Sequence, residues 1–134
     1  MITRLYADRA LPIILSFLLL FSCDGRKEHL EYYEDGNIRS RVYLVDGKRE
    51  GIVTTYSSTG KIISKHTYKE DSLTGPYEVF FPDGGLAEKG QMKNGRRVGR
   101  IFQYHPNGKI HFEHYMISVD GRPFPYYSQE FNSA

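Results

Sequence analysis

Residues 77–99 read YEVFFPDGGLAEKGQMKNGRRVG, and this stretch is one copy of a unit that recurs every 24 residues. A glycine marks the same point in each unit, at Gly36, Gly60, Gly84 and Gly108. A second glycine follows fifteen residues later, at Gly51, Gly75 and Gly99, with Pro123 in the fourth copy. Aromatic and aliphatic residues keep the same step, at Tyr32, Tyr56, Phe80 and Tyr104, and at Ile38, Ile62, Leu86 and Ile110. A fixed period of this length predicts a repeat architecture.

Each unit predicts a β-hairpin. The runs Pro82-Asp83-Gly84 and Pro106-Asn107-Gly108 are turn signals, because proline presets one turn residue and glycine takes the left-handed conformation. A three-residue loop with a glycine bulge would pair Tyr104 with Ile110 and Phe102 with Phe112. The same register pairs Phe80 with Leu86 and Tyr56 with Ile62, so we prefer it to a two-residue loop.

The hairpins are expected to join into one sheet, because a lone hairpin is marginally stable in water. Residues 38–44 and 110–116 alternate between positions expected to be less and more exposed to solvent. The predicted fold is therefore all-β, an elongated antiparallel meander of about four 24-residue hairpin repeats over residues 29–128, followed by a tail over residues 129–134. After a late turn at Asp120-Gly121, residues 124–127 can form a last strand, with Pro123 and Pro125 protecting the sheet edge.

The first 22 residues predict an export signal ahead of the only cysteine. Arg4 and Arg9 precede an almost wholly apolar run over residues 10–21, which is too short for an ordinary membrane span. Residues 20–23 read LFSC and resemble the bacterial lipoprotein box, in which the cysteine is lipidated. An exported chain with one cysteine can form no internal disulfide, which favours this reading.

We therefore expect a signal-peptide helix over residues 1–22, a lipidated Cys23 and a short tether over residues 23–28. These features would attach the protein to a bacterial envelope membrane through its lipid. A plain signal peptide and an uncleaved signal anchor are the alternatives.

Composition and motifs exclude several classes of function. The chain after residue 22 carries 16 basic and 15 acidic residues, so its balance of +1 argues against a dedicated nucleic-acid binder. No nucleophile elbow, phosphate-binding glycine loop or paired acids occur, so we expect neither an enzyme nor a cofactor nor a small-molecule substrate. His111 and His114 are an odd number of residues apart, which would place them on opposite faces, and with His105 they complete no metal site.

Aromatic side chains are the candidate binding groups. A single-layer sheet has little means of burying both faces, so we expect exposed aromatic surface at Tyr43, Tyr77, Phe81 and Tyr115. The ladder of Tyr32, Tyr56, Phe80 and Tyr104 is open to two interpretations, packing or anchors for a partner. Seven basic residues near turns either are solvated or meet anionic lipid: Arg39, Arg41, Lys48, Arg49, Arg96, Arg97 and Arg100.

The repeat consensus resembles the MORN-variant repeat over about residues 32–123. It reads aromatic-x-x-[Asp/Asn]-Gly-x-[Ile/Leu], then an aromatic residue or methionine, then Asn-Gly-x-x-x-Gly. Bacterial proteins built from this repeat include the YwqK-type antitoxins. The resemblance implies an elongated antiparallel sheet with no catalytic motif, and roles in protein binding, membrane association or toxin neutralisation. Leu44, Met116 and the run Ser57-Ser58-Thr59 depart from the pattern.

Three hypotheses of function follow from these patterns. The first is a membrane-anchored envelope module that binds an unknown protein partner through its wetter face or a free sheet edge. The second is an antitoxin or immunity role, in which that partner is a toxin. The third is weak binding of a glycan or lipid through the tyrosines.

Overall fold

The computed structural model describes residues 25–119 and 122–132, and within them the chain forms one β-sheet. The ten strands are β1 (Lys27–Tyr32), β2 (Ile38–Val45), β3 (Lys48–Arg49), β4 (Gly51–Tyr56), β5 (Ile62–Lys69), β6 (Ser72–Phe80), β7 (Leu86–Lys93), β8 (Arg96–Tyr104), β9 (Ile110–Val119) and β10 (Arg122–Glu130). Nowhere in these two ranges is there a helix with the length and apolar character of a membrane span.

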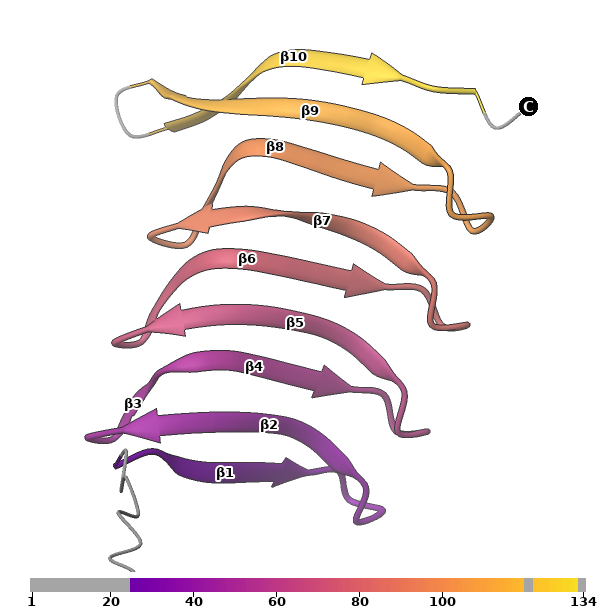
Figure 1. The fold of residues 1–134 in the computed structure, drawn as a ribbon. Helices are drawn as coiled ribbons and strands as arrows, with labels where there is room; N and C mark the ends of the chain where they lie inside the picture. The colour runs from indigo at the N-terminus through magenta and orange to yellow at the C-terminus, as the bar shows by residue number, and fades with distance from the viewer. Residues whose placement is uncertain (1–24, 120–121, 133–134) are drawn as a thin grey trace, which may run out of the picture.

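The strands follow one another across the sheet in chain order, and every neighbouring pair is antiparallel (Figure 1). Only the two-residue strand β3 leaves this path, pairing with β2. The predicted all-β meander of hairpin repeats is thus confirmed. Strand β1 begins inside the segment expected to be a tether, and β10 extends two residues beyond the expected end of the repeats. The predicted signal peptide, Cys23 and the Asp120-Gly121 turn lie outside the described residues.

The turn after each first strand has the predicted three-residue loop. In the last copy the amide of His105 donates to the carbonyl of Lys109 (2.8 Å), and Gly108 donates back to His105 (2.8 Å). The same pair of bonds closes the other three loops. All four loop glycines have positive φ, between 79° and 97°, a region that glycine enters without steric cost. The pairs Tyr56–Ile62, Phe80–Leu86 and Tyr104–Ile110 are those predicted.

One residue beyond these pairs, each hairpin contains a bulge that the sequence did not predict. Tyr104 pairs with Ile110, but Gln103 pairs with Phe112, which leaves His111 as an extra residue. The predicted pairing of Phe102 with Phe112 is therefore wrong, because Phe102 lies opposite Glu113. Equivalent bulges occur in the other three hairpins, so they share the 24-residue period. A bulge inserts an unpaired residue and changes which face the following side chains occupy.

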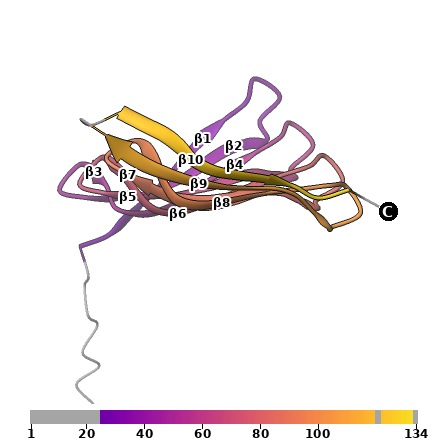
Figure 2. The same ribbon diagram turned by 90° about the horizontal axis from the view of Figure 1, so that it is seen from above.

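The second glycine of each repeat, at Gly51, Gly75 or Gly99, lies at a wider break in the strand pairing between successive hairpins. In the β5–β6 pair, Thr67 alone lies opposite the three residues Thr74, Gly75 and Pro76. Gly75 has a φ of 93°, and Gly51 and Gly99 at the equivalent positions also have positive φ. Bulges bend strands, and the strands of this sheet are visibly bowed (Figures 1 and 2).

The described chain is a single layer (Figure 2). The side chains on its two faces differ. The five buried side chains share one face, which we call the Glu88 face: Ser40, Val42, Tyr77, Glu88 and Ile101. The opposite face, which we call the Lys89 face, carries a row of residues paired across successive strands: Arg41, Thr54, Lys65, Glu78, Lys89, Phe102 and Glu113. Adjacent residues of a strand point to opposite faces, so the two sets are distinct surfaces.

Candidate functional site

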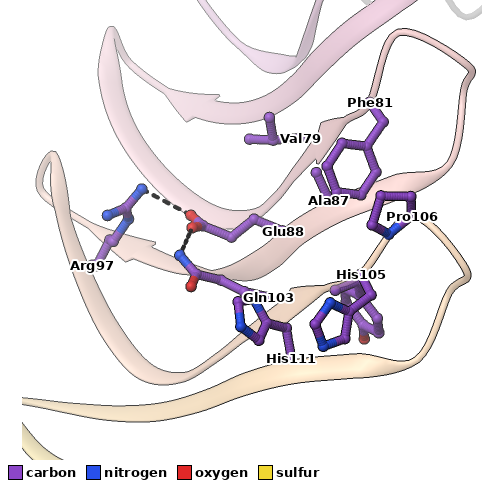
Figure 3. Close-up of a pocket in the computed structure, with 10 residues that line it drawn as sticks. Val79, Phe81, Ala87, Glu88, Arg97, Gln103, His105, Pro106 and His111 are labelled. Atoms are coloured by element: carbon purple, nitrogen blue, oxygen red, sulfur yellow. Dashed lines mark hydrogen bonds and ion pairs between the residues drawn. The ribbon is translucent and has the colours of Figure 1, made fainter. Parts of the chain in front are cut away.

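A buried carboxylate organises the Glu88 face. Glu88 lies in β7, and its side chain accepts three hydrogen bonds from the neighbouring strands. Tyr77 of β6 donates its hydroxyl to Oε1 (2.6 Å), Arg97 of β8 donates to the same oxygen (2.8 Å), and Gln103 donates to Oε2 (2.8 Å). Figure 3 shows Arg97 and Gln103 meeting the carboxylate from β8. A buried charge is costly unless it is paired and hydrogen-bonded, and here it is both.

Tyr77 is buried, contrary to the sequence-based expectation that its ring is exposed. Only 2% of the residue is accessible, and the reason lies on the next strand. Its partner Gly90 has no side chain, and a Cβ there would lie 2.9 Å from the tyrosine ring and 3.1 Å from Ile101. Glycine therefore makes the room that the ring fills. Burial, together with the hydrogen bond to Glu88, raises the pKa of Tyr77 well above its ordinary value.

His66 completes the packing around Tyr77. The two rings are stacked, with centroids 5.8 Å apart and an angle of 5° between planes. Burial, followed by the nearby charge of Arg97, lowers the pKa of His66 below 6.5. The neutral imidazole is thus the favoured form beside this ring.

A shallow hollow of about 550 Å³ opens beside Glu88. Val79, Phe81 and Ala87 give it an apolar wall, and the opposite wall carries polar side chains from β8, β9 and the loop between them (Figure 3). Those polar residues are Arg97, Gln103, His105 and His111. The hollow has the size and mixed chemistry to accept a side chain of a partner, and Phe81, a predicted binding residue, lines it.

The histidines lie on one face, not on opposite faces as predicted. Because His111 is the bulge residue of β9, the strict alternation of side chains fails there. The rings of His105, His111, Phe112 and His114 form a continuous series with centroid distances of 4.1, 4.0 and 5.5 Å. In residues 25–119 and 122–132, no group of three His, Cys, Asp or Glu side chains could hold a metal ion.

The exposed apolar side chains gather on the other surface, the Lys89 face. Seven large hydrophobic residues are exposed in the described chain, and two of them, Ile63 and Tyr126, are bulge residues. The other five occupy regularly paired positions, and the strand alternation places all of them on the Lys89 face: Tyr32, Ile52, Tyr115, Phe124 and Tyr127.

This arrangement divides the four aromatic residues that the sequence nominated for binding. Tyr43 and Tyr115 lie on the Lys89 face, whereas Tyr77 and Phe81 belong to the Glu88 face. The four residues therefore do not form one surface.

Cations and aromatic rings alternate along the Lys89 face in a pattern that sequence reasoning missed. The Lys65 ammonium lies 5.4 Å from the centroid of Phe80, and the Lys89 ammonium lies 5.7 Å from that of Tyr104. Arg41 and Tyr56 stand at the equivalent positions and line one hollow. In each case the ring follows the cation by fifteen residues. The ladder of basic residues at positions 41, 65 and 89 was the sequence signal for these cation–ring units.

A comparison with known protein families agrees with this geometry. The profile of the MORN repeat variant family matches residues 27–46, 49–70, 73–94 and 97–117. The chain belongs to this family. A MORN repeat of this type is a non-catalytic, binding-type repeat, which indicates a repeat-based binding module. A search of curated proteins found no match.

Each cation–ring unit bridges two MORN repeats. Lys65 lies in the second matched segment and Phe80 in the third, and Lys89 and Tyr104 divide in the same way between the third and the fourth. The series on the Lys89 face therefore exists only when MORN repeats stack in sequence. A surface of this kind is a property of the array and not of one repeat.

Proposed function

We propose that the protein is a lipid-anchored module of the bacterial envelope that binds another protein through its Lys89 face. The observation that carries this proposal is the distribution of exposed apolar side chains, because all five at regular strand positions lie on that face. Tyr115 and Tyr127 are paired across β9 and β10, and with Phe124 of β10 they form an exposed apolar cluster at one end of this face. Exposed apolar clusters of this kind usually mark an interaction site.

Charge indicates the kind of partner. Three cations stand on the Lys89 face at the same point of successive repeats, Arg41, Lys65 and Lys89. Arg41 pairs with Glu28 (3.0 Å) and Lys65 has a long contact with Glu78 (3.7 Å), whereas Lys89 has no ion pair with any other described residue. A partner with an acidic contact surface complements this face, and such complementarity governs specificity and association rate more than affinity.

The short segment before the sheet supports a partner at the membrane. Strand β1 begins at Lys27, four residues after the cysteine that we expect to carry the lipid. Four extended residues reach about 14 Å. With Cys23 lipidated, the first repeat would therefore lie beside the bilayer.

A face-specific crosslinking experiment tests the binding surface. Ile52 and Val53 are neighbours in β4 and point to opposite faces, so they form a matched pair of positions. A photo-crosslinking amino acid is introduced at each position of the full chain, in cells of the source bacterium. We expect one protein adduct through position 52 and none through position 53. Adducts through position 53 alone, or none at either position, would overturn the proposal.

The anchor is tested separately by labelling. Cells expressing the full chain are grown with a clickable fatty-acid analogue, and the purified protein is examined for the label. We expect labelled wild type and unlabelled Cys23→Ser, because the cysteine is the residue that would be acylated. An unlabelled wild type, or equal label on both, would contradict the lipid anchor and leave the crosslinking result unaffected.

A further inference from the structure

The Lys89 face has a regular spacing along the direction that crosses its strands. Cations at positions 41, 65 and 89 stand on every second strand, in register with one another through the intervening Thr54 and Glu78. Neighbouring strands are 4.7–4.9 Å apart, so the cations recur about every 9.6 Å. The rings of Tyr56, Phe80 and Tyr104 recur at the same interval, since they share the 24-residue period.

A ligand that contacts every cation–ring unit must present the same kind of chemical group once per interval. A polyproline II segment advances about 3.1 Å per residue with three residues per turn, so one face recurs about every 9.3 Å. Over the two intervals that separate the three cations, the mismatch with the sheet is only about 0.6 Å. Two turns of an α-helix advance about 10.8 Å, which accumulates a mismatch of about 2.4 Å over the same two intervals. An extended strand repeats a face about every 6.7 Å and does not fit.

The side chains suit an acidic segment of this conformation. The Lys89 ammonium lies 5.5 Å from the centroid of Phe102 and 5.7 Å from that of Tyr104, and within the described chain it has no ion-pair partner. Lys65 shares only a long contact of 3.7 Å with the partly exposed Glu78. Both cations can therefore meet a carboxylate from outside. Prolines and aromatic rings pack well together, as in the aromatic-lined grooves that bind proline-rich segments.

We propose that the Lys89 face binds an acidic polyproline II segment that runs across the strands, with a carboxylate at every third residue and prolines between. Each carboxylate meets the cation of one unit, and the prolines lie on the rings of the ladder. This inference rests on the proposed protein-binding function and names the class of segment that the partner presents. The fourth repeat has Glu113 in place of the cation, so the site ends there.

Binding of defined peptides tests the match of spacing. The full chain, purified in detergent micelles, is titrated against a fluorescent peptide of four Glu-Pro-Pro triplets. The control peptide has the same composition but its four glutamates come first and its eight prolines follow. We expect the triplet peptide to bind roughly tenfold more tightly, because both peptides have the same charge and only one has the right spacing. A Gln-Pro-Pro peptide should bind weakly.

Two variants test the residues. Lys65→Gln combined with Lys89→Gln should weaken binding of the triplet peptide about tenfold or more, because two of the three cations that would pair with its carboxylates are lost. Lys48→Gln changes one charge at the start of β3, away from the row, and should weaken binding less than about twofold. Circular dichroism checks that each variant is folded.

The remaining outcomes each decide against the inference. Equal affinity for the two acidic peptides would show simple charge attraction, and would overturn the proposed spacing. Binding of polygalacturonate with no binding of the triplet peptide would assign the face to an acidic glycan. No binding of any probe, together with a position-52 adduct in cells, would overturn the class of segment while the proposed function stands.

Discussion

At the scale of single residues, the side chain of Tyr77 links the core of the sheet to its buried charge. Tyr77→Phe keeps the ring but removes one of the three donors to Glu88. We expect the free energy of unfolding to fall by about 1–3 kcal/mol, because a hydrogen bond to a charged group is lost. Urea denaturation followed by circular dichroism measures this change.

The matched control for that substitution is Tyr43→Phe. The Tyr43 hydroxyl makes only a long 3.4 Å contact with the exposed Glu28. Its loss should cost less than about 0.5 kcal/mol. Equal effects of the two substitutions would contradict the organising role of the Glu88 cluster.

His66 makes stability depend on pH. Burial and Arg97 lower its folded pKa below the ordinary 6.5, so below pH 6.5 the unfolded chain binds more protons than the folded one. The free energy of unfolding therefore decreases as the pH falls from 6.5 to the folded pKa. In His66→Gln this contribution is absent, so the stability lost between pH 7.5 and pH 5 should be smaller than in wild type.

Denaturation curves at several pH values test this expectation. His29→Gln is the control, because His29 lies on the same face but is exposed. Its pH profile should match that of wild type. A His66→Gln profile that is as steep as the wild-type profile would exclude His66 as the source of the dependence.

At the scale of the strand and turn, backbone geometry sets the cost of changing a glycine. Gly75 has a φ of +93°, and an added Cβ would lie 3.3 Å from Thr67. Gly75→Ala should therefore lower the free energy of unfolding by about 1–3 kcal/mol. Gly60→Asn, in an open loop at φ +79°, should cost less than about 1 kcal/mol because asparagine tolerates this region. Denaturation midpoints that rank the two in the opposite order would refute the assignment.

The turns and bulges of the strands also show which features the sequence could predict and which it could not. The loop at Pro106-Asn107-Gly108 was predictable because its residues carry their own conformational preferences. The adjacent bulge at His111 was not, since bulge residues such as Ile63, Ala87 and His111 share no chemical type. The missed bulge explains the wrong pairing of Phe102 and the wrong face for His111. The burial of Tyr77 depends on Gly90, whose role appears only once the register is known.

At the scale of the whole molecule, each repeat is joined to the next by more than the strand ladder. The Tyr33 hydroxyl donates to the carbonyl of Tyr56 (2.7 Å), and Asn37 donates to that of Ser58 (2.8 Å). Lys61 donates to the carbonyl of Pro82 (2.8 Å). These bonds connect a loop with the loop of the following hairpin. Stability is then approximately a sum over repeats and the interfaces between neighbours.

A deletion of one full period tests this additivity. Removing residues 61–84 joins Gly60 to Gly85 and preserves the 24-residue spacing of the repeated glycine, aromatic and aliphatic positions. We expect a folded sheet with two fewer long strands. The m-value, which is the slope of the free energy of unfolding against denaturant concentration, should be lower by about a fifth to a quarter, in proportion to the surface buried. The control removes residues 66–88, one fewer, and joins Lys65 to Lys89 inside a strand. It should be less stable, because a one-residue slip within a strand turns the following side chains to the opposite face.

The shortened array also bears on binding. Removing residues 61–84 deletes Lys65 and Phe80, which leaves two cation–ring units in place of three. Affinity for the Glu-Pro-Pro peptide should fall about tenfold, because one carboxylate contact of the series is lost. A shortened, folded chain that keeps the full affinity would mean that binding is confined to one repeat. The regular spacing of the Lys89 face would then have no role in recognition.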